Sequence, residues 1–193
     1  QRRENRRRGN SAMMVKTIFS GFGGQGVLMM GYSLAHGAMS AGYNVTFLPA
    51  YGAEVRGGTA NCTVAVSDDE IASPIASEPD NIVVLNTPSL YTFQNRVAPE
   101  GALFLNSSII AVESSRHDVR IFKIPSSEMA EKLGNPRTAN TVMMGAFLKM
   151  TGLVPPDIYL NSMETVMGSK KKSVIEINQK AFAAGYEFLK MKE

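Results

Sequence analysis

Short apolar runs divide the chain into predicted strands. Residues 82–85 and 102–105 are continuously apolar, which is typical of parallel strands buried on both faces. Residues 60–66 alternate, with Cys62 and Val64 on one face, and this pattern predicts a half-buried strand. Further strands are expected at 15–20, 44–48 and 119–124, where β-branched and aromatic residues gather.

Apolar residues at helical spacing predict helices between and after these strands. Residues 27–39 place Gly31, Ala35 and Ala38 on one face, and such small side chains allow a helix to lie close against a sheet. Thr87 before Pro88, and Ser126, are expected to cap short helices. Longer helices are predicted at 135–152, at 155–168 and over the last twenty or so residues, with Gly42, Gly152 and Gly168 as helix ends.

The alternation of strands and helices predicts an α/β fold. We expect a Rossmann-like, mainly parallel sheet with helices on both faces, and a helical C-terminal third that covers one edge or face. A chain of 193 residues is expected to form about one domain. No internal repeat or linker interrupts residues 13–193, which we therefore treat as a single domain.

The positive charge is concentrated at the N-terminal end. Residues 1–12 hold five Arg and one Glu, so removing their net +4 from the formal +3 leaves −1. We interpret residues 1–12 as a tag or a disordered arm. A nearly neutral body gives no electrostatic reason to expect a nucleic-acid partner.

Cysteine and histidine are scarce, with Cys62 alone and two histidines, His36 and His117. These counts exclude a disulfide framework, a Cys-ligated iron–sulfur cluster and a Cys/His metal site within the chain. Cys62 lies on the apolar face of its strand and is expected to be a buried, inert thiol. No run approaches the ~18 apolar residues of a membrane span, so we expect no membrane partner and a cytoplasmic location.

A glycine-rich turn is the strongest motif in the chain. It joins the predicted first strand to the predicted first helix with the spacing Gly21-x-Gly23-x-x-Gly26. We expect Gly21 and Gly23 to adopt backbone angles that a Cβ would forbid, and Gly26 to let the helix pack on the strand. The N–H groups at the helix start suit an anion. The acidic residue that a nicotinamide dinucleotide needs after the second strand is missing, and the glycines alone are compatible with a purely structural turn.

Three segments resemble the gamma subunit of the 2-oxoacid:ferredoxin oxidoreductases. The first is residues 21–27 (Gly-Phe-Gly-Gly-Gln-Gly-Val), and the second is residues 54–59 (Glu-Val-Arg-Gly-Gly-Thr). The Ala-Asn-Cys continuation at 60–62 resembles the 2-oxoglutarate-type branch, and residues 140–146 (Asn-Thr-Val-Met-Met-Gly-Ala) resemble an Asn-rich, Gly-Ala helix of the family. The likeness extends from about residue 15 to the end of the chain.

The resemblance implies one part of a larger enzyme. Family members cleave a 2-oxoacid with coenzyme A to an acyl-CoA, carbon dioxide and two electrons, which pass to ferredoxin. In the family, thiamine diphosphate with Mg is bound by the alpha and beta subunits, and the iron–sulfur clusters by beta or by a delta subunit. This chain is then expected to hold no catalytic residue and no metal, and to be inactive without alpha and beta.

The resemblance also implies a role for the two glycine segments. The first is expected to offer N–H groups to a phosphate of coenzyme A, and Arg56 to reach the same anion or a carboxylate on alpha. The residues assigned to this binding are Gly21, Gly23, Gly24, Gln25, Gly26, Arg56, Gly57, Gly58 and Thr59. Glu54, Arg56 and Asn140 are assigned to a subunit interface, although an exposed ion pair at Glu54 and Arg56 would contribute little energy.

Other readings stay open at this point. The chain is compatible with a stand-alone Rossmann-type oxidoreductase that binds NAD(P) or FAD, and with a scaffold whose glycines serve only backbone geometry. A relative acting on branched-chain 2-oxoacids or indolepyruvate is also compatible with the motifs. The sequence gives no oligomeric state for the isolated chain and is compatible with a homodimer formed through surfaces meant for its partners.

Overall fold

The computed structural model describes residues 13–51, 59–168 and 170–189, and these contain a six-stranded sheet. The strands lie in the order β2-β3-β1-β4-β5-β6. Their bounds are β1 Met14–Phe22, β2 Asn44–Tyr51, β3 Thr59–Ser67, β4 Asn81–Val84, β5 Ala102–Asn106 and β6 Arg120–Ile124. The sheet is mostly parallel, as the apolar runs predict, because β1, β4, β5 and β6 pair in parallel register.

Strand β3 departs from the simple alternation of parallel strands and helices. It lies between β1 and β2 and is antiparallel to both, with Phe19 opposite Cys62 and Phe47 opposite Val64. Strands β2 and β3 follow one another directly in the chain, and an antiparallel pair needs only a short connection whereas a parallel pair needs a crossover. The predicted strand is confirmed, but only its first half is half-buried, because Val64, Ala65, Val66 and Ser67 are all buried. The sequence did not predict that the strand is antiparallel.

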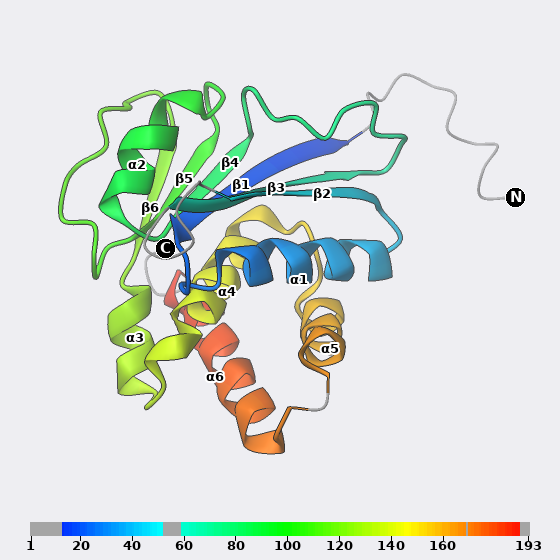
Figure 1. The fold of residues 1–193 in the computed structure, drawn as a ribbon, viewed down its shortest axis with the longest axis vertical. Coiled ribbons are helices and arrows are strands. Elements are labelled where there is room, and N and C mark those ends of the chain that lie inside the picture. The colour runs from blue at the N-terminus through cyan, green and yellow to red at the C-terminus, as the bar shows by residue number, and fades with distance from the viewer. Residues whose placement is uncertain (1–12, 52–58, 169, 190–193) are drawn as a thin grey trace, which may run out of the picture.

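Helices cover both faces of the sheet, as predicted (Figure 1). Their bounds are α1 Val27–Ser40, α2 Thr87–Phe93, α3 Ser126–Lys132, α4 Ala139–Thr151, α5 Pro156–Met167 and α6 Lys172–Phe188, with short 3₁₀ turns at Gln94–Arg96 and Pro136–Thr138. Helix α2 lies on one face, and α1 and α4 lie on the other. Helices α5 and α6 form a further layer, α5 against α1 and α6 against α4, so the C-terminal third covers a face of the sheet.

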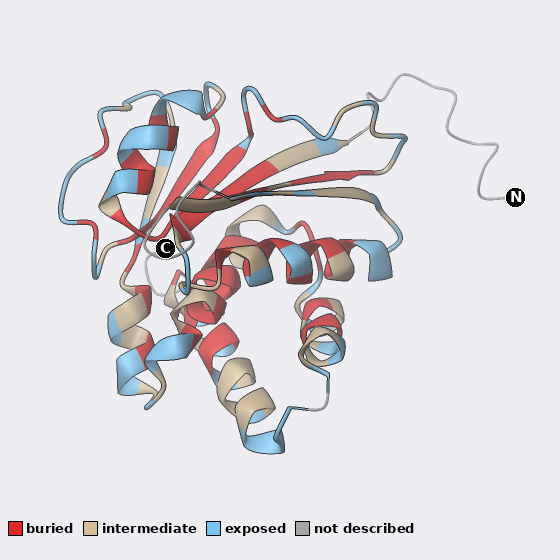
Figure 2. Cartoon of the chain, in the orientation of Figure 1, coloured by how far each residue is buried: buried red, intermediate tan, exposed pale blue. Residues whose placement is uncertain are grey.

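Aromatic side chains join helix α4 to the sheet. Phe147 is fully buried and meets the rings of Phe19 and Phe104 edge-on, with centroids 5.6 and 5.2 Å apart. Phe104 also stacks on Phe122 at 4.9 Å. Such pairs add to the burial of apolar area. Buried residues accordingly concentrate on the sheet and on the helix sides that face it (Figure 2).

Glycines set the close helix contacts. A Cβ on Gly31 would overlap Cys62 Sγ and lie 3.0 Å from Phe47 Cε2, so Gly31 is the residue that lets α1 rest on the sheet. The expectation that Gly26 lets the helix pack on the strand is wrong, because a Cβ on Gly26 would meet Asn140 of α4 and not the sheet. Helices α4 and α6 cross even more closely, because a Cβ on Gly145 would overlap Phe182 O.

Two predicted helix caps shift by one residue. Asn86, not Thr87, caps α2, and its side-chain Oδ1 accepts from Ser89 N at 2.9 Å. Ser126 is the first residue of α3 rather than its cap, which falls on Pro125. Gly42 follows the end of α1 with φ +90°, as its assignment to the helix end predicts.

Candidate functional site

The glycine-rich turn connects β1 to α1 at the carboxyl edge of the sheet. Positive φ angles occur at Gly24 (+97°) and Gly26 (+78°), and not at Gly21 or Gly23 as expected. Gly21 instead leaves room for its neighbours, because a Cβ there would lie 2.6 Å from Gln25 Oε1 and 3.2 Å from Leu85 Cβ. Within the described chain no atom comes within 4 Å of a Cβ built on Gly23, so that side of the turn is open.

Gln25 braces the turn rather than pointing out of it. Its Oε1 accepts from Phe22 N at 2.7 Å and from Asn86 Nδ2 at 3.0 Å, and its Nε2 donates to Leu85 O at 3.3 Å. Asn86 in turn caps α2. The side chain of Gln25 therefore links the turn after β1 to the end of β4.

The N-terminus of α1 is available to an anion. Gly26 occupies the N-cap position, and no side chain among the described residues caps this helix. The first N–H groups of a helix have no acceptor within it, and the helix dipole places partial positive charge there. The first turn of α1 holds no acidic residue that would compete with an anion.

A cavity of about 260 Å³ opens beside this helix start. Its lining residues come from the carboxyl ends of β1, β4 and β5 and the turns that follow them, from the start of α3, and from the 3₁₀ turn and first residues of α4. They are Gly24, Gln25, Leu85, Asn106, Ser127, Pro136, Arg137, Ala139 and Asn140. Ligands of open α/β sheets bind outside the carboxyl ends of the strands, at the point where the strand order reverses. Here that point lies between β1 and β4, so the cavity is in the expected place.

Two residues at the start of α4 complete the cavity. Asn140 lies so close to the turn that a Cβ on Gly26 would overlap its Nδ2, which gives Gly26 a second reason to be glycine. Arg137 is exposed and lines both this cavity and a smaller one of about 180 Å³ between α1, α4 and α5. Sequence reasoning missed Arg137, whose only sequence signal is its place after Asn135-Pro136 at a helix start.

The second glycine segment approaches the same turn. Thr59, the first residue of β3, pairs with Phe22, the last residue of β1. Glu54, Arg56, Gly57 and Gly58 lie outside the described residues. The two segments that carry the family resemblance therefore meet at Thr59 and Phe22, and the binding roles assigned to them stay predictions.

Two buried titratable groups near α1, the Cys62 thiol and the Tyr159 hydroxyl, stay protonated at neutral pH. Cys62 is fully buried, and burial raises the pKa of its thiol from 9.0 to about 12. Burial likewise raises the pKa of Tyr159 to about 12, and its hydroxyl lies 3.4 Å from Ser33 Oγ. A nucleophile or metal ligand must be a thiolate, so Cys62 acts as a small apolar side chain, as predicted.

No cluster of three or more His, Cys, Asp or Glu side chains among the described residues is placed to hold a metal ion. Every helix in the described part is too short or too polar to cross a membrane.

Comparison with known proteins identifies relatives of the whole described fold. Residues 16–188 match the family described as pyruvate ferredoxin/flavodoxin oxidoreductase. The chain is 39% identical over 176 residues to ketoisovalerate oxidoreductase subunit VorA of Methanothermobacter thermautotrophicus, covering 90% of this chain and 36% of that protein. It is 31% identical over 182 residues to 2-oxoglutarate synthase subunit KorC of Methanocaldococcus jannaschii, covering 92% of this chain and 95% of KorC.

The fold has a close counterpart among solved structures. A 2-oxoglutarate:ferredoxin oxidoreductase from Magnetococcus marinus, with 2-oxoglutarate, coenzyme A and succinyl-CoA bound, superposes with a TM-score of 0.86 at 21% identity, over 94% of this chain and 32% of that one. The chain thus spans about a third of VorA and of the Magnetococcus chain, and nearly all of KorC. On the extent of the family match and the identity to KorC, the chain belongs to the pyruvate ferredoxin/flavodoxin oxidoreductase family.

Proposed function

We propose that this chain is the gamma component of a complex that oxidises a 2-oxoacid with coenzyme A, and that its glycine-rich turn receives the diphosphate of coenzyme A. The observation that carries the proposal is the uncapped N-terminus of α1, which faces a cavity of about 260 Å³ beside Arg137. A diphosphate carries negative charge and many acceptor oxygens, which main-chain N–H groups and a guanidinium bind well. Coenzyme A is present in the Magnetococcus neighbour, which supports the choice of ligand.

The electron-transfer chemistry is assigned to partner subunits. A single cysteine cannot supply the four thiolates of an iron–sulfur cluster. Thiamine diphosphate with Mg and the clusters would then be held by alpha, beta and, where the complex has one, delta, with ferredoxin as the acceptor. Exposed apolar side chains on α1, Met29, Tyr32 and Met39, are compatible with cover by such a partner.

Two 2-oxoacids are favoured as substrate. The Ala60-Asn61-Cys62 segment resembles the 2-oxoglutarate-type branch, and KorC relatives bear that name. The identity to VorA is higher, at 39% against 31%, and favours ketoisovalerate. Turnover of the reconstituted complex with 2-oxoglutarate, 2-oxoisovalerate, pyruvate and indolepyruvate decides between them.

The test of the coenzyme A site uses the complex with alpha and beta. Gly23→Ala places a methyl group on the open side of the turn, and Arg137→Ala removes the guanidinium. A hydrogen bond to a charged group is worth about 1.5–3 kcal/mol, so Arg137→Ala should raise the KM for coenzyme A about 10-fold or more. Gly23→Ala removes no hydrogen bond, but its methyl group occupies space that the diphosphate needs and should also raise the KM for coenzyme A. Neither change should alter the KM for the 2-oxoacid. Lys132→Ala, an exposed cation on α3, is the matched control.

Two results would refute the proposal. An unchanged coenzyme A KM in both variants would leave the glycines with a structural role only. Reduction of a viologen dye by the isolated chain, or tight binding of NAD(P) or FAD to it, would favour a self-sufficient oxidoreductase instead.

A further inference from the structure

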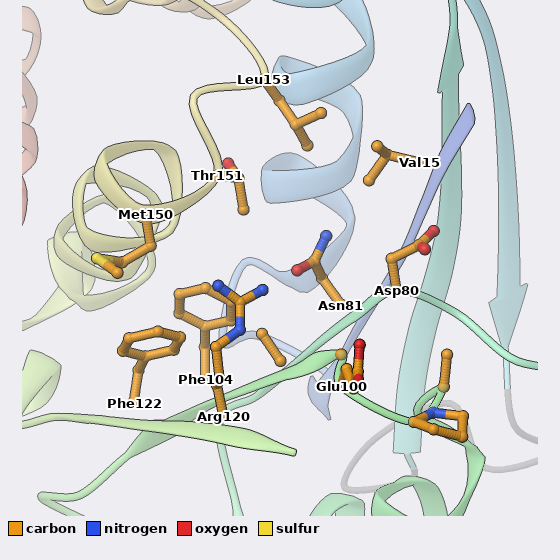
Figure 3. Close-up of a pocket in the computed structure, with 14 residues that line it drawn as sticks. Val15, Asp80, Asn81, Glu100, Phe104, Arg120, Phe122, Met150, Thr151 and Leu153 are labelled. Atoms are coloured by element: carbon orange, nitrogen blue, oxygen red, sulfur yellow. The ribbon is translucent and has the colours of Figure 1, made fainter. Parts of the chain in front are cut away.

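A third cavity lies at the opposite edge of the sheet. It has a volume of about 410 Å³, larger than the two cavities described above, and it opens where β1, β4, β5 and β6 begin. Side chains from these strands form its floor, and Met150, Thr151 and Leu153 at the end of α4 form its roof (Figure 3). The proposed function makes no use of this cavity.

Strand register places one row of side chains on the floor. Thr17, Asn81, Ala102 and Arg120 are paired across β1, β4, β5 and β6, so they share one face of the sheet. Phe104 and Phe122 lie two residues further along their strands, on the same face. The cavity is therefore built from successive rows of one sheet face and is a fixed part of the fold.

One polar side chain of the floor is open to a ligand. Asn81 is 6% exposed and lines the cavity, and no hydrogen bond to its carboxamide is found in the described part of the chain. Thr17, its neighbour in register, is 1% exposed with an Oγ1 that has no partner among those residues, but it lies outside the cavity lining. The Asn81 carboxamide, which can both donate and accept, can therefore hydrogen-bond to a ligand in the cavity.

The charged residues of the cavity are separated. Arg120 forms no ion pair with any described residue, and it rises from β6 beside the small side chain of Ala102. Asp80 and Glu100 lie on the other side of Asn81 in Figure 3. Asp80 is fixed there because its Oδ2 accepts from Lys16 N at 2.7 Å. A cation and carboxylates thus face a common space without neutralising one another.

The rest of the lining is apolar. Phe122 stacks on Phe104 at 4.9 Å, and Met150 lies near these rings, whereas Leu153 lies farther away on the side of Val15. The rings and Met150 lie on the side of Arg120, so an apolar group can pack there while charged groups reach both poles of the cavity.

We propose that this amino-edge cavity binds a free α-amino acid with an apolar side chain. The carboxylate lies against Arg120 and the Asn81 carboxamide, and the ammonium group lies against Asp80 and Glu100. The side chain packs on Phe122 and Met150. A simple carboxylate would leave two acidic groups facing its own charge, and a simple amine would leave Arg120 unpaired, so the zwitterion fits the charge distribution best.

Binding is measured on the full chain by titration calorimetry with L-valine, L-leucine, L-methionine and L-phenylalanine. The strongest ligand is then compared with its deaminated acid and its decarboxylated amine. Loss of either charged group should weaken binding about 10-fold or more. The absence of heat for all four amino acids up to about 10 mM would overturn the proposal, as would an acid or amine that binds as tightly as the amino acid.

Substitutions locate the site. Arg120→Ala should weaken binding about 10-fold or more. Lys123→Ala removes the same charge from the opposite face of β6, where Lys123 pairs with Glu113 in solvent, and should leave binding unchanged. Equal affinity in the two variants would overturn the assignment.

A third variant separates binding from folding. Asn81→Leu replaces an unpartnered carboxamide with an apolar group of similar size, so the melting temperature should stay the same or rise while amino-acid binding is lost. If Asn81→Leu binds the amino acid as the parent chain does, the proposed contact is wrong. A large fall in melting temperature with retained binding would show that the carboxamide serves the fold instead.

Discussion

Replacing Gln25 with alanine tests whether the glycine-rich turn is held by its side chain. The change removes the two bonds accepted by Oε1, at 2.7 Å from Phe22 N and 3.0 Å from Asn86 Nδ2, and the 3.3 Å bond from Nε2 to Leu85 O. It creates no clash, because it only shortens a half-buried side chain.

The expected loss of stability can be worked from these contacts. Each intramolecular hydrogen bond contributes about 1 kcal/mol net, and the longest of the three contributes less. Water can reach part of the space that Gln25 vacates, whereas the Asn86 carboxamide is 1% exposed and would lose a partner. The free energy of unfolding should therefore fall by about 2 kcal/mol, which lowers the melting temperature of a chain of this size by about 4–8 °C.

Thermal unfolding followed by circular dichroism measures the effect, with urea unfolding as a second readout. Gly23→Ala is the matched control in the same turn, because its Cβ meets no described atom and its φ is not positive, and it should change stability by less than about 0.5 kcal/mol. Gln25→Glu keeps the acceptor oxygens and should fall between the two. A melting temperature for Gln25→Ala within about 1 °C of the parent chain would show that the Gln25 side chain does not stabilise the turn.

Three further changes test the core. Gly145→Ala should cost about 2–3 kcal/mol, because its Cβ overlaps Phe182 O and must push α4 and α6 apart; an unchanged urea midpoint would contradict this crossing. Phe147→Ala should cost about 3–5 kcal/mol by the same measurement, since a fully buried ring is lost. The pKa of the Cys62 thiol is about 12 in the fold against 9.0 when free, so its contribution to stability is complete below pH 9 and is lost progressively as the pH rises towards 12. Cys62→Ala should therefore make the unfolding free energy fall less steeply with pH above pH 9, by at most about 1.4 kcal/mol per pH unit. Parallel pH profiles for the variant and the parent chain would contradict this.

The arrangement of strands could be predicted from the sequence in most respects. Continuous apolar runs such as 82–85 identify buried parallel strands because both faces must be apolar. The direction of β3 could not be predicted, since the alternation of Cys62 and Val64 is the same for either direction. The cap of α2 falls on Asn86 rather than Thr87 because both residue types cap helices, and the partnership of Asn86 with Gln25 depends on tertiary structure.

The candidate site could be predicted only as far as local geometry reaches. The turn from 21 to 26 is recognisable because the spacing of its glycines indicates where the backbone needs positive φ angles or close contacts. The contribution of Arg137 and the contact of Asn140 with Gly26 arise from helix packing over more than a hundred residues of sequence. The amino-edge cavity has no sequence signature, because Asn81 and Arg120 are brought together by strand register alone.

The central position of β1 has a consequence for folding during translation. Of the six strands β1 is synthesised first, yet its two neighbours in the sheet are β3, which ends at Ser67, and β4, which ends at Val84. An apolar strand whose neighbours have not been synthesised is exposed to aggregation. The hairpin of β2 and β3 can form from local sequence and offer β1 its first edge. Translation must then continue to Val84 before the second edge of β1 is covered, which makes this early interval the stage at which nascent chains most need protection.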